Sequence, residues 1–201
     1  VNHGTYPFVT SSSPSSGGIA TGLGLPLTKV NRIVGIFKAY TTRVGKGPLP
    51  TELFDDNGEK LRDLGKEYGA TTGRPRRCGW FDAVEAKYSV QINGFTEITL
   101  TKLDILVDIP KIKLVTAYKD GDKTLTTFPS RINQLARCQP VYEEFEGFGE
   151  VKDAKSFHEL PRAAQDFIRR IESYLGIPAR IISVGPERSH HLVQEEIHVA
   201  G

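Results

Sequence analysis

Apolar residues near the start of the chain recur at the spacing of an α-helix. Thr28 is a suitable N-cap residue, and the apolar positions after it lie at i, i+3, i+4 and i+7, with one more a turn later. We therefore predict a helix that begins after Thr28. Its apolar face consists of Val30, Ile33, Val34, Phe37 and Tyr40.

Three further segments have the composition or spacing of helices. Residues 57–68 form a short charged segment that ends before Gly69, and a turn-rich segment leads into a helix with apolar positions at Phe81, Val84 and Tyr88. Pro161 is a favoured first residue of a longer helix, and Gly176 is a favoured terminator. The apolar face of that helix consists of Phe167, Ile168, Ile171 and Leu175.

Segments rich in β-branched and apolar residues alternate with these helices. Asp120-Gly121-Asp122 has the composition of a hairpin turn between two strands. Strands mixed with helices indicate the α/β class, with an antiparallel hairpin attached. The strands are predicted at 95–106, where the strand runs into a loop, and at 111–118, 124–128, 140–145 and 179–183.

Composition argues against several classes of protein. The chain of 201 residues has 26 Lys and Arg against 24 Asp and Glu, a formal net charge of +2, which gives no bulk attraction to nucleic acid or membranes. Cys78 and Cys138 form no C-x-x-C pair, which argues against a zinc ribbon and suits a reducing cytoplasm. No apolar run approaches the roughly 20 residues that span a bilayer. The chain contains no Met, so we expect a fragment or a processed piece.

Residues 101–104 read TKLD and lie at the end of the strand Phe95–Leu100, where the 95–106 segment runs into its loop. Ligands bind at the carboxyl ends of strands in open α/β sheets. A carboxylate there can accept hydrogen bonds from the N1–H and the 2-amino group of guanine, two donors that adenine lacks, and Lys102 can lay its stem along the base. The pattern resembles the guanine-specific N-K-x-D motif, with Thr101 in place of Asn. Asp104 therefore predicts guanine selection, and the alternative is a strand end with solvated charges.

Residues 69–77, GATTGRPRR, combine three arginines with two threonines and two glycines. An Arg guanidinium matches the geometry of carboxylate and phosphate groups, and the hydroxyls add donors. The segment predicts an anion receptor. Two alternatives stay open: an RNA-contact loop, which would bind phosphates without sequence preference, and a solvated basic turn.

Two other turn-rich segments carry weaker signals. Residues 183–186, SVGP, follow the last predicted strand, where backbone N–H groups can face the O6 of a base, although Ser, Gly and Pro are ordinary turn residues. Residues 10–24 are rich in Ser and Gly, and this composition favours a flexible linker over an ordered ligand loop.

The remaining candidates receive structural interpretations. Trp80 and Cys78 are predicted to be buried, and the His190–His191 pair to be solvated. Glu143 and Glu144 are adjacent in a strand, so they face opposite sides and cannot form an acid/base pair. The chain contains no G-x-x-x-x-G-K-[ST] phosphate-binding loop.

Several longer runs, taken together, resemble the adenylosuccinate synthetase family. Residues 3–12 read HGTYPFVTSS, and residues 38–45 read KAYTTRVG, followed by Gly47-Pro48 and Pro50-Thr51-Glu52. The stretches at 71–80, 101–104 and 183–186 also match in the family's order and spacing. The resemblance covers essentially the entire chain. It implies part of a P-loop-NTPase-like (GTPase-like) mixed sheet with flanking helices and an antiparallel hairpin.

The resemblance also implies an activity and a set of binding residues. The family joins L-aspartate to inosine monophosphate (IMP) with GTP and Mg²⁺, on the route to AMP. Residues 1–201 would be the C-terminal portion of a single domain, with IMP and aspartate loops over 1–80 and guanine recognition and a C-terminal subdomain over 95–201. The implied IMP-binding residues are Thr10, Val44 and Arg74. Those for aspartate are Ala70, Thr71, Thr72, Gly73, Arg74 and Arg76. Those for GTP are Arg76, Lys102, Leu103, Asp104, Ser183, Val184 and Gly185.

The same resemblance implies which parts this chain lacks. The family's Gly-rich phosphate loop, catalytic Asp and His, Mg²⁺ ligands, and an Arg donated across a homodimer interface lie in its N-terminal half. We therefore expect no catalytic residue and no metal ligand here, a cytoplasmic location, no nucleic-acid or membrane partner, and no synthetase activity from the chain alone. Pro75 departs from the basic residue of many relatives and stiffens the loop.

Two alternatives to a ligase half-enzyme stay open. One is a non-catalytic module that binds guanine nucleotide or an anionic ligand. The other is an RNA-binding piece that uses Arg74, Arg76 and Arg77, against which the small net charge weighs.

Overall fold

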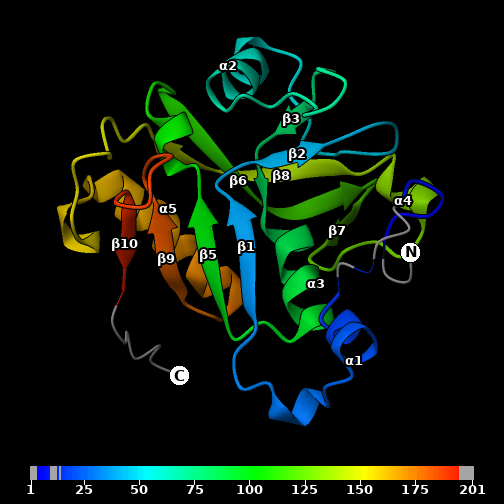
Figure 1. Ribbon diagram of the computed structural model, residues 1–201. Helices are drawn as coiled ribbons and strands as arrows, with labels where there is room; N and C mark the ends of the chain where they lie inside the picture. The colour runs from blue at the N-terminus through cyan, green and yellow to red at the C-terminus, as the bar shows by residue number, and fades with distance from the viewer. Residues whose placement is uncertain (1–3, 10–12, 14, 195–201) are drawn as a thin grey trace.

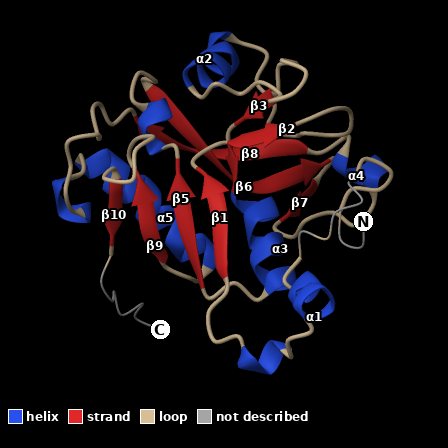
Figure 2. Ribbon diagram, viewed as in Figure 1, coloured by secondary structure: helices blue, strands red, loops and turns tan. Residues whose placement is uncertain are grey.

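The computed structural model describes residues 4–9, 13 and 15–194, which fold into an α/β structure (Figures 1 and 2). One sheet has the strand order β1-β5-β9-β10. Its first three strands run parallel, and β10 is antiparallel to β9. The strands are β1 (Val34–Lys38), β5 (Glu97–Thr101), β9 (Ala179–Ser183) and β10 (His191–Val193).

A second sheet is centred on the long strand β6 (Lys111–Asp120), which pairs in parallel with β4 (Phe81–Asp82). It pairs antiparallel with both β7 (Lys123–Leu125) and β8 (Gln139–Glu146). The turn at 120–122 joins β6 to β7, so the predicted hairpin is confirmed. A two-stranded sheet of β2 (Thr41–Arg43) and β3 (Arg77–Gly79) lies between the larger sheets and α2 in Figure 1.

The helices pack around these sheets and begin at identifiable caps. The carboxylate of Asp82 accepts hydrogen bonds from the amides of Val84 and Glu85 and starts α3, as an N-cap residue does. Helix α5 ends at Gly176, as predicted. The α-helices are α1 (Gly17–Leu23), α2 (Asp56–Leu64), α3 (Ala83–Asn93), α4 (Ile132–Leu135) and α5 (Arg162–Leu175). Short 3₁₀ helices are η1 (Leu27–Lys29), η2 (Leu103–Leu106) and η3 (Phe157–Glu159).

The core lies between the parallel sheet and helices α3 and α5. Phe167, Ile168 and Ile171, the predicted apolar face of α5, have no exposed surface. Each such side chain contributes about 1.5–3 kcal/mol by its removal from water. Trp80 and Cys78 are also buried, as predicted. Within the described part of the chain, no helix combines the length and apolarity needed to cross a membrane.

The predicted helix after Thr28 is wrong, because residues 34–38 form strand β1 and only the short 3₁₀ helix η1 precedes them there. Val34 to Lys38 pair in register with Glu97 to Thr101 of β5. Val34 and Ile36 are β-branched, which favours a strand. Pairing with β5 therefore outweighs the helical spacing of the apolar residues, which is only a weak local preference. Gly35 permits the close approach of Phe95, since a Cβ at this position would lie 2.6 Å from that ring.

The structure also corrects the bounds of several other predicted elements. Phe81 is in β4 and not in the helix, which starts at Ala83. The linker expected at 10–24 contains helix α1, and the Ser16 amide donates to the Asn93 side chain at 2.9 Å. The charged helix ends at Leu64. Strand β10 was not predicted.

Candidate functional site

The predicted nucleotide-binding segments meet at one edge of the parallel sheet. Strands β1, β5 and β9 all point toward the same edge, and α2 lies beyond it (Figure 1). Lys38 at the end of β1 is in register with Thr101 of β5. Since Lys102 and Val184 directly follow β5 and β9, this edge gathers residues that are distant in sequence, as binding sites of open α/β sheets do.

The segment after β5 holds the Asp104 carboxylate partly buried at this sheet edge. Lys102 has a left-handed backbone (φ 62°), and the chain then turns into η2, in which Leu103 is buried. Asp104 is half-buried, and its carboxylate accepts no hydrogen bond from another described residue. Burial raises the pKa of this carboxyl group, and its own amide and Lys102 oppose the shift. The group is thus partly desolvated and open to hydrogen-bond donors.

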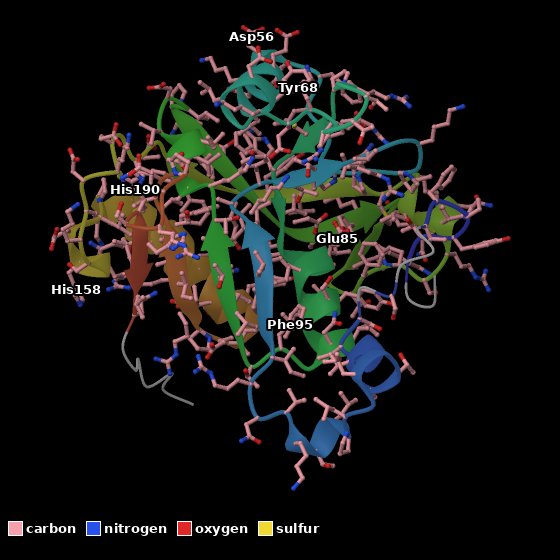
Figure 3. The ribbon with its side chains drawn as sticks, viewed as in Figure 1. Asp56, Tyr68, Glu85, Phe95, His158 and His190 are labelled. Atoms are coloured by element: carbon pink, nitrogen blue, oxygen red, sulfur yellow. The ribbon has the colours of Figure 1, made fainter. Side chains whose placement is uncertain are left out.

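The turn after β9 closes beside Asp104. Ser183 Oγ donates to the Gly185 carbonyl at 2.9 Å, and the Val184 amide donates to the His190 carbonyl at 2.9 Å. A Cβ on Gly185 would lie 2.5 Å from His190 Nδ1, so a larger residue here would push the His190 side chain aside. His190 is near enough to Asp104 to lower the pKa of that carboxyl group, and it is half-buried, not solvated as predicted (Figure 3).

A buried carboxylate that the sequence did not reveal connects three loops at this edge. The side chain of Glu67 has no exposed surface. Its Oε1 accepts hydrogen bonds from Lys38 Nζ (2.8 Å), Lys102 Nζ (2.8 Å) and the Tyr40 hydroxyl (2.6 Å). Its Oε2 accepts from Arg76 Nη1 at 2.8 Å and Lys38 Nζ at 2.9 Å. Glu67 thereby joins the end of β1, the TKLD segment and the arginine segment.

The charge state of this cluster follows from its contacts. Burial alone would raise the pKa of Glu67, but the hydrogen bonds from Lys102, Lys38 and Tyr40 lower it to about 2. Burial and the neighbouring carboxylate raise the pKa of Tyr40. Burial lowers the pKa of Lys38, and Glu67 opposes the shift. Glu67 is therefore an anion across the physiological range, and Tyr40 acts as a neutral donor.

The arginine segment forms a tight exposed loop above the cluster. The Gly69 amide donates to the Arg74 carbonyl at 2.9 Å, and the Gly73 amide donates to the Gly69 carbonyl at 2.8 Å. Tyr68 pairs with Pro75 at the base of the loop. Residues 70–75, which include Thr71, Thr72 and Arg74, are exposed.

Arg77 differs from the other arginines of this segment. Its Nε donates to Glu52 Oε1 at 2.8 Å, its Nη2 donates to the same carboxylate, and its Nη1 donates to the carbonyls of Gly45 and Gly47. The guanidinium is thus held by the protein itself and is not free for RNA phosphates, which weakens that alternative.

Of the residues predicted to contact IMP, Val44 lies on a neighbouring loop and Arg74 on the arginine loop. Val44 is 70% exposed. Arg43 Nη2 donates to Thr5 Oγ1 at 3.0 Å and to the Phe8 carbonyl at 3.2 Å, which holds the segment before Thr10 against this loop. Thr10 itself lies outside the described residues.

Two acidic side chains line a cavity of about 220 Å³ between β1, β2, β4 and α3. Asp82 Oδ2 accepts a hydrogen bond from the Tyr118 hydroxyl at 2.5 Å. Burial raises the pKa of both Asp82 and Glu85. The nearby Asp82 raises the pKa of Glu85 further, and Arg43 lowers it in part (Figure 3). The pair therefore disfavours double ionisation in the folded chain.

We expect Glu85→Gln to stabilise the chain at pH 8 but not at pH 4. The folded-state pKa of Glu85 is raised to about 7 from 4.5, so the native state holds a proton that the unfolded state releases. Stability is therefore lost as pH rises through this window. A gain of about 1 kcal/mol would raise the melting temperature by about 2–4 °C. Thermal unfolding of both chains at the two pH values measures the effect, and an equal shift at pH 4 would contradict it.

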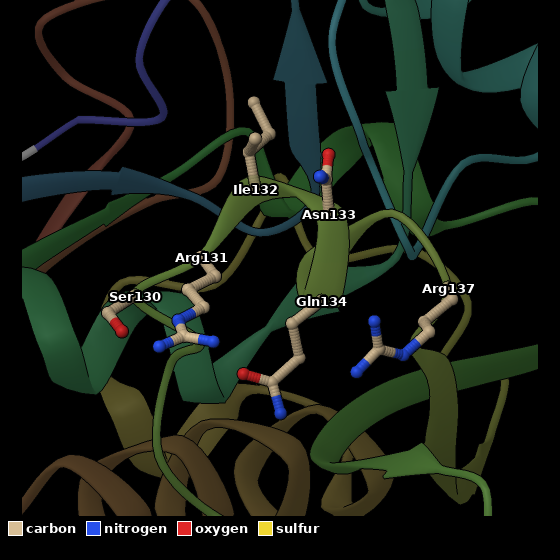
Figure 4. A pocket seen from close by; sticks show the side chains of 6 residues that line it. All are labelled: Ser130, Arg131, Ile132, Asn133, Gln134 and Arg137. Carbon is tan, nitrogen blue, oxygen red and sulfur yellow. The ribbon is translucent and has the colours of Figure 1, made fainter.

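A second cavity, of about 570 Å³, lies at α4 and has no predicted site residue in its lining (Figure 4). Arg137 Nε and Gln134 Nε2 both donate to Asp120, at 2.5 and 2.9 Å. These groups brace the β6–β7 hairpin. Among the described residues, no group of three or more His, Cys, Asp or Glu side chains is arranged to hold a metal ion.

Comparisons with known proteins identify the family of the chain. The family model described as adenylosuccinate synthetase matches residues 1–192. The adenylosuccinate synthetase of Thermoanaerobacter sp. (strain X514) is 56% identical over 191 residues, covering 94% of this chain and 45% of the relative. That of Geotalea uraniireducens is 52% identical over 194 residues, covering 96% and 45%.

A solved structure shares the fold. The chain superposes on the structure of fully ligated adenylosuccinate synthetase from Plasmodium falciparum with a TM-score of 0.92 and 43% identity, covering 96% of this chain and 46% of that one. The chain thus spans about half the length of the relatives it matches. By its matched family model and by these identities, the chain belongs to the adenylosuccinate synthetase family.

Proposed function

We propose that the chain is the guanine-recognising and aspartate-binding part of a GTP-dependent ligase that joins L-aspartate to IMP. The observation that carries this proposal is the meeting of the TKLD segment, the 183–185 turn and the arginine loop at one sheet edge, joined through Glu67. The products are adenylosuccinate, GDP and phosphate, on the route to AMP.

Guanine is the base that this pocket fits. Asp104 accepts the N1–H and 2-amino donors of guanine, which adenine cannot supply. Lys102 lays its stem beside the base, while its ammonium is fixed by Glu67 and by the Gly65 carbonyl at 2.5 Å. Ser183, Val184 and Gly185 would close the far side of the base, in a turn whose Val184 amide already donates to the His190 carbonyl.

The exposed loop is the proposed receptor for L-aspartate. Thr71 and Thr72 offer hydroxyls, and Arg74 and Arg76 offer guanidinium groups that match a carboxylate. Ala70 and Gly73 complete the loop backbone. Arg74 also reaches IMP, Arg76 the GTP phosphates, and Thr10 and Val44 the IMP phosphate and ribose. In domain terms, residues 1–80 supply the IMP and aspartate loops, and residues 95–201 supply guanine recognition.

The chemistry itself is assigned to a part of the enzyme outside this chain. In the proposed reaction GTP would phosphorylate the C6 oxygen of IMP, and the aspartate amine would then displace phosphate; a Mg²⁺ ion bound in that part would neutralise phosphate charge. We place the Mg²⁺ ligands, the phosphate loop and the catalytic acid and base in the remaining half, and we propose a cytoplasmic homodimer for the whole enzyme.

The edge of β1 is the proposed junction with that half. Within the described residues β1 pairs with β5 on one side only. Ile36 is 77% exposed and Val34 41% exposed, an apolar edge of the kind that proteins normally cover. A further strand added here would continue the sheet.

We expect the pure chain to show no synthetase turnover, because the groups assigned to the chemistry lie elsewhere. Adding the complementary half of a relative should restore turnover if the two parts reassemble along β1. The measurement is adenylosuccinate formation from IMP, aspartate and GTP. Turnover by the isolated chain would overturn this assignment.

A non-catalytic module that binds guanine nucleotide is the second candidate. It is favoured by Asp104, whose half-buried carboxylate lies beside the 183–185 turn without any need of a catalytic group. Guanine-selective binding without restored turnover would support it.

A further inference from the structure

Two adjacent arginines, Arg76 and Arg77, are held in very different ways. A guanidinium has five N–H donors. Arg77 uses its donors on the Glu52 carboxylate and on two backbone carbonyls. Arg76, within the described part of the chain, makes one side-chain hydrogen bond, from Nη1 to Glu67, and its Nε is buried without a partner. A buried donor without a partner is costly, so Arg76 makes fewer hydrogen bonds in this position than its guanidinium could make elsewhere.

The charge balance around Glu67 allows Arg76 to leave. One carboxylate contacts three cations, Lys38, Lys102 and Arg76. Breaking a buried ion pair is strongly destabilising when it leaves a charge uncompensated. Without Arg76, however, Glu67 keeps two hydrogen bonds from Lys38, one from Lys102 and one from Tyr40. The excess of positive charge also favours an incoming anion.

We propose that Glu67 is a positioning residue that holds Arg76 in reserve and releases it to an anionic ligand of the 69–76 loop. The identity of that ligand as L-aspartate rests on the proposed function. Arg76 is 31% exposed, so its head group can reach a ligand by rotating about its own side-chain bonds. Lys102 donates to the same Glu67 carboxylate, so the TKLD segment and the 69–76 loop share one counterion.

A double-mutant cycle in the full 201-residue chain tests this link. Glu67→Gln keeps the side-chain shape and removes the charge that holds Arg76. We expect the affinity for the ligand to rise about three- to fivefold, the upper part of the range for one partly exposed ion pair. In an Arg76→Gln background the same substitution should change the affinity less than twofold, because its effect acts through Arg76.

The probes are L-aspartate and inorganic pyrophosphate, titrated separately and followed by NMR. Glu52→Gln is the matched control, since it removes a carboxylate paired with the neighbouring Arg77 and should leave the affinity within twofold. If Glu67→Gln raised the affinity equally with Arg76 present and with Arg76→Gln, the effect would come from the loss of negative charge alone. That result would overturn the proposal. A fall in affinity with Glu67→Gln would assign Glu67 a merely structural role, and it would overturn the proposal as well.

The wild-type chain supplies a readout that needs no variant. Adding the probe should shift the Arg76 Nε–H resonance as the guanidinium exchanges Glu67 for the ligand. A probe that shifts Thr71 and Thr72 but leaves Arg76 unmoved would contradict the proposal while the loop's binding role stands. A response to pyrophosphate with none to L-aspartate would instead keep the release of Arg76 and refute the proposed substrate.

Discussion

Replacement of Asp104 by Ala should abolish the preference of the chain for guanine over adenine nucleotides. The half-buried carboxylate can accept hydrogen bonds from two donors that guanine has and adenine lacks. No other described residue donates a hydrogen bond to it. Hydrogen bonds to a charged group contribute about 1.5–3 kcal/mol each. Loss of both predicts a fall in the GTP-to-ATP affinity ratio of about 100-fold or more. Competition binding with a fluorescent guanine nucleotide measures the ratio.

Asp108→Ala is the matched control for this experiment. Asp108 lies four residues along the same segment and is exposed, so its replacement should leave the ratio unchanged. If Asp104→Ala kept the guanine preference, base selection would belong to other groups, and the TKLD segment would be an ordinary strand end.

Replacement of Glu67 by Ala should destabilise the chain more than any surface substitution. It leaves Lys38, Lys102 and Arg76 close together without their shared counterion. Loss of one member of a buried charge cluster costs about 3–5 kcal/mol, which corresponds to a fall of roughly 10 °C in melting temperature for a chain of this size. Differential scanning calorimetry at neutral pH measures the loss.

The same residue predicts how stability depends on acid. The pKa of Glu67 is lowered to about 2 in the folded chain from 4.5. Its contribution is thus complete above pH 4.5 and is lost as pH falls toward 2, and it amounts to about 3 kcal/mol. Glu67→Ala should flatten the acid limb of the stability curve.

Glu144→Ala offers the comparison for both measurements. Glu144 pairs with Lys113 at 3.0 Å, but its side chain is 55% exposed, so its loss should cost at most about 1 kcal/mol. Equal losses for Glu144→Ala and Glu67→Ala would mean that the cluster around Glu67 contributes nothing special.

The sequence predicted those elements whose pattern and end signals agree. Helix α5 has a continuous apolar face between Pro161 and Gly176, and the structure places it at Arg162–Leu175. The 120–122 hairpin is confirmed for the same reason. Glu143 and Glu144 also face different partners, Arg170 and Lys113. In each case local chemistry and tertiary packing favour the same conformation.

Strand β1 was mistaken for a helix because its partner is distant in sequence. Val34 lies opposite Glu97, more than sixty positions away, and no local spacing encodes such a pairing. Strand β10 was missed because its three residues are too short for a periodic pattern.

The site divides along the same line. Asp104 and the arginine loop were predicted because each is a compact cluster of chemically distinctive residues. Glu67 was missed because an isolated Glu between Lys66 and Tyr68 has no sequence signal. Its role arises only when the fold brings Lys38 and Lys102 to it.

Calorimetric titration of the pure chain with GTP, GDP and ATP tests the central claim most directly. The guanine contacts lie in this chain and the phosphate cradle does not, so we predict binding of GTP and GDP at roughly micromolar to millimolar affinity and markedly weaker binding of ATP. No binding of either guanine nucleotide, or equal binding of ATP, would contradict the account of a guanine-selective pocket at this sheet edge.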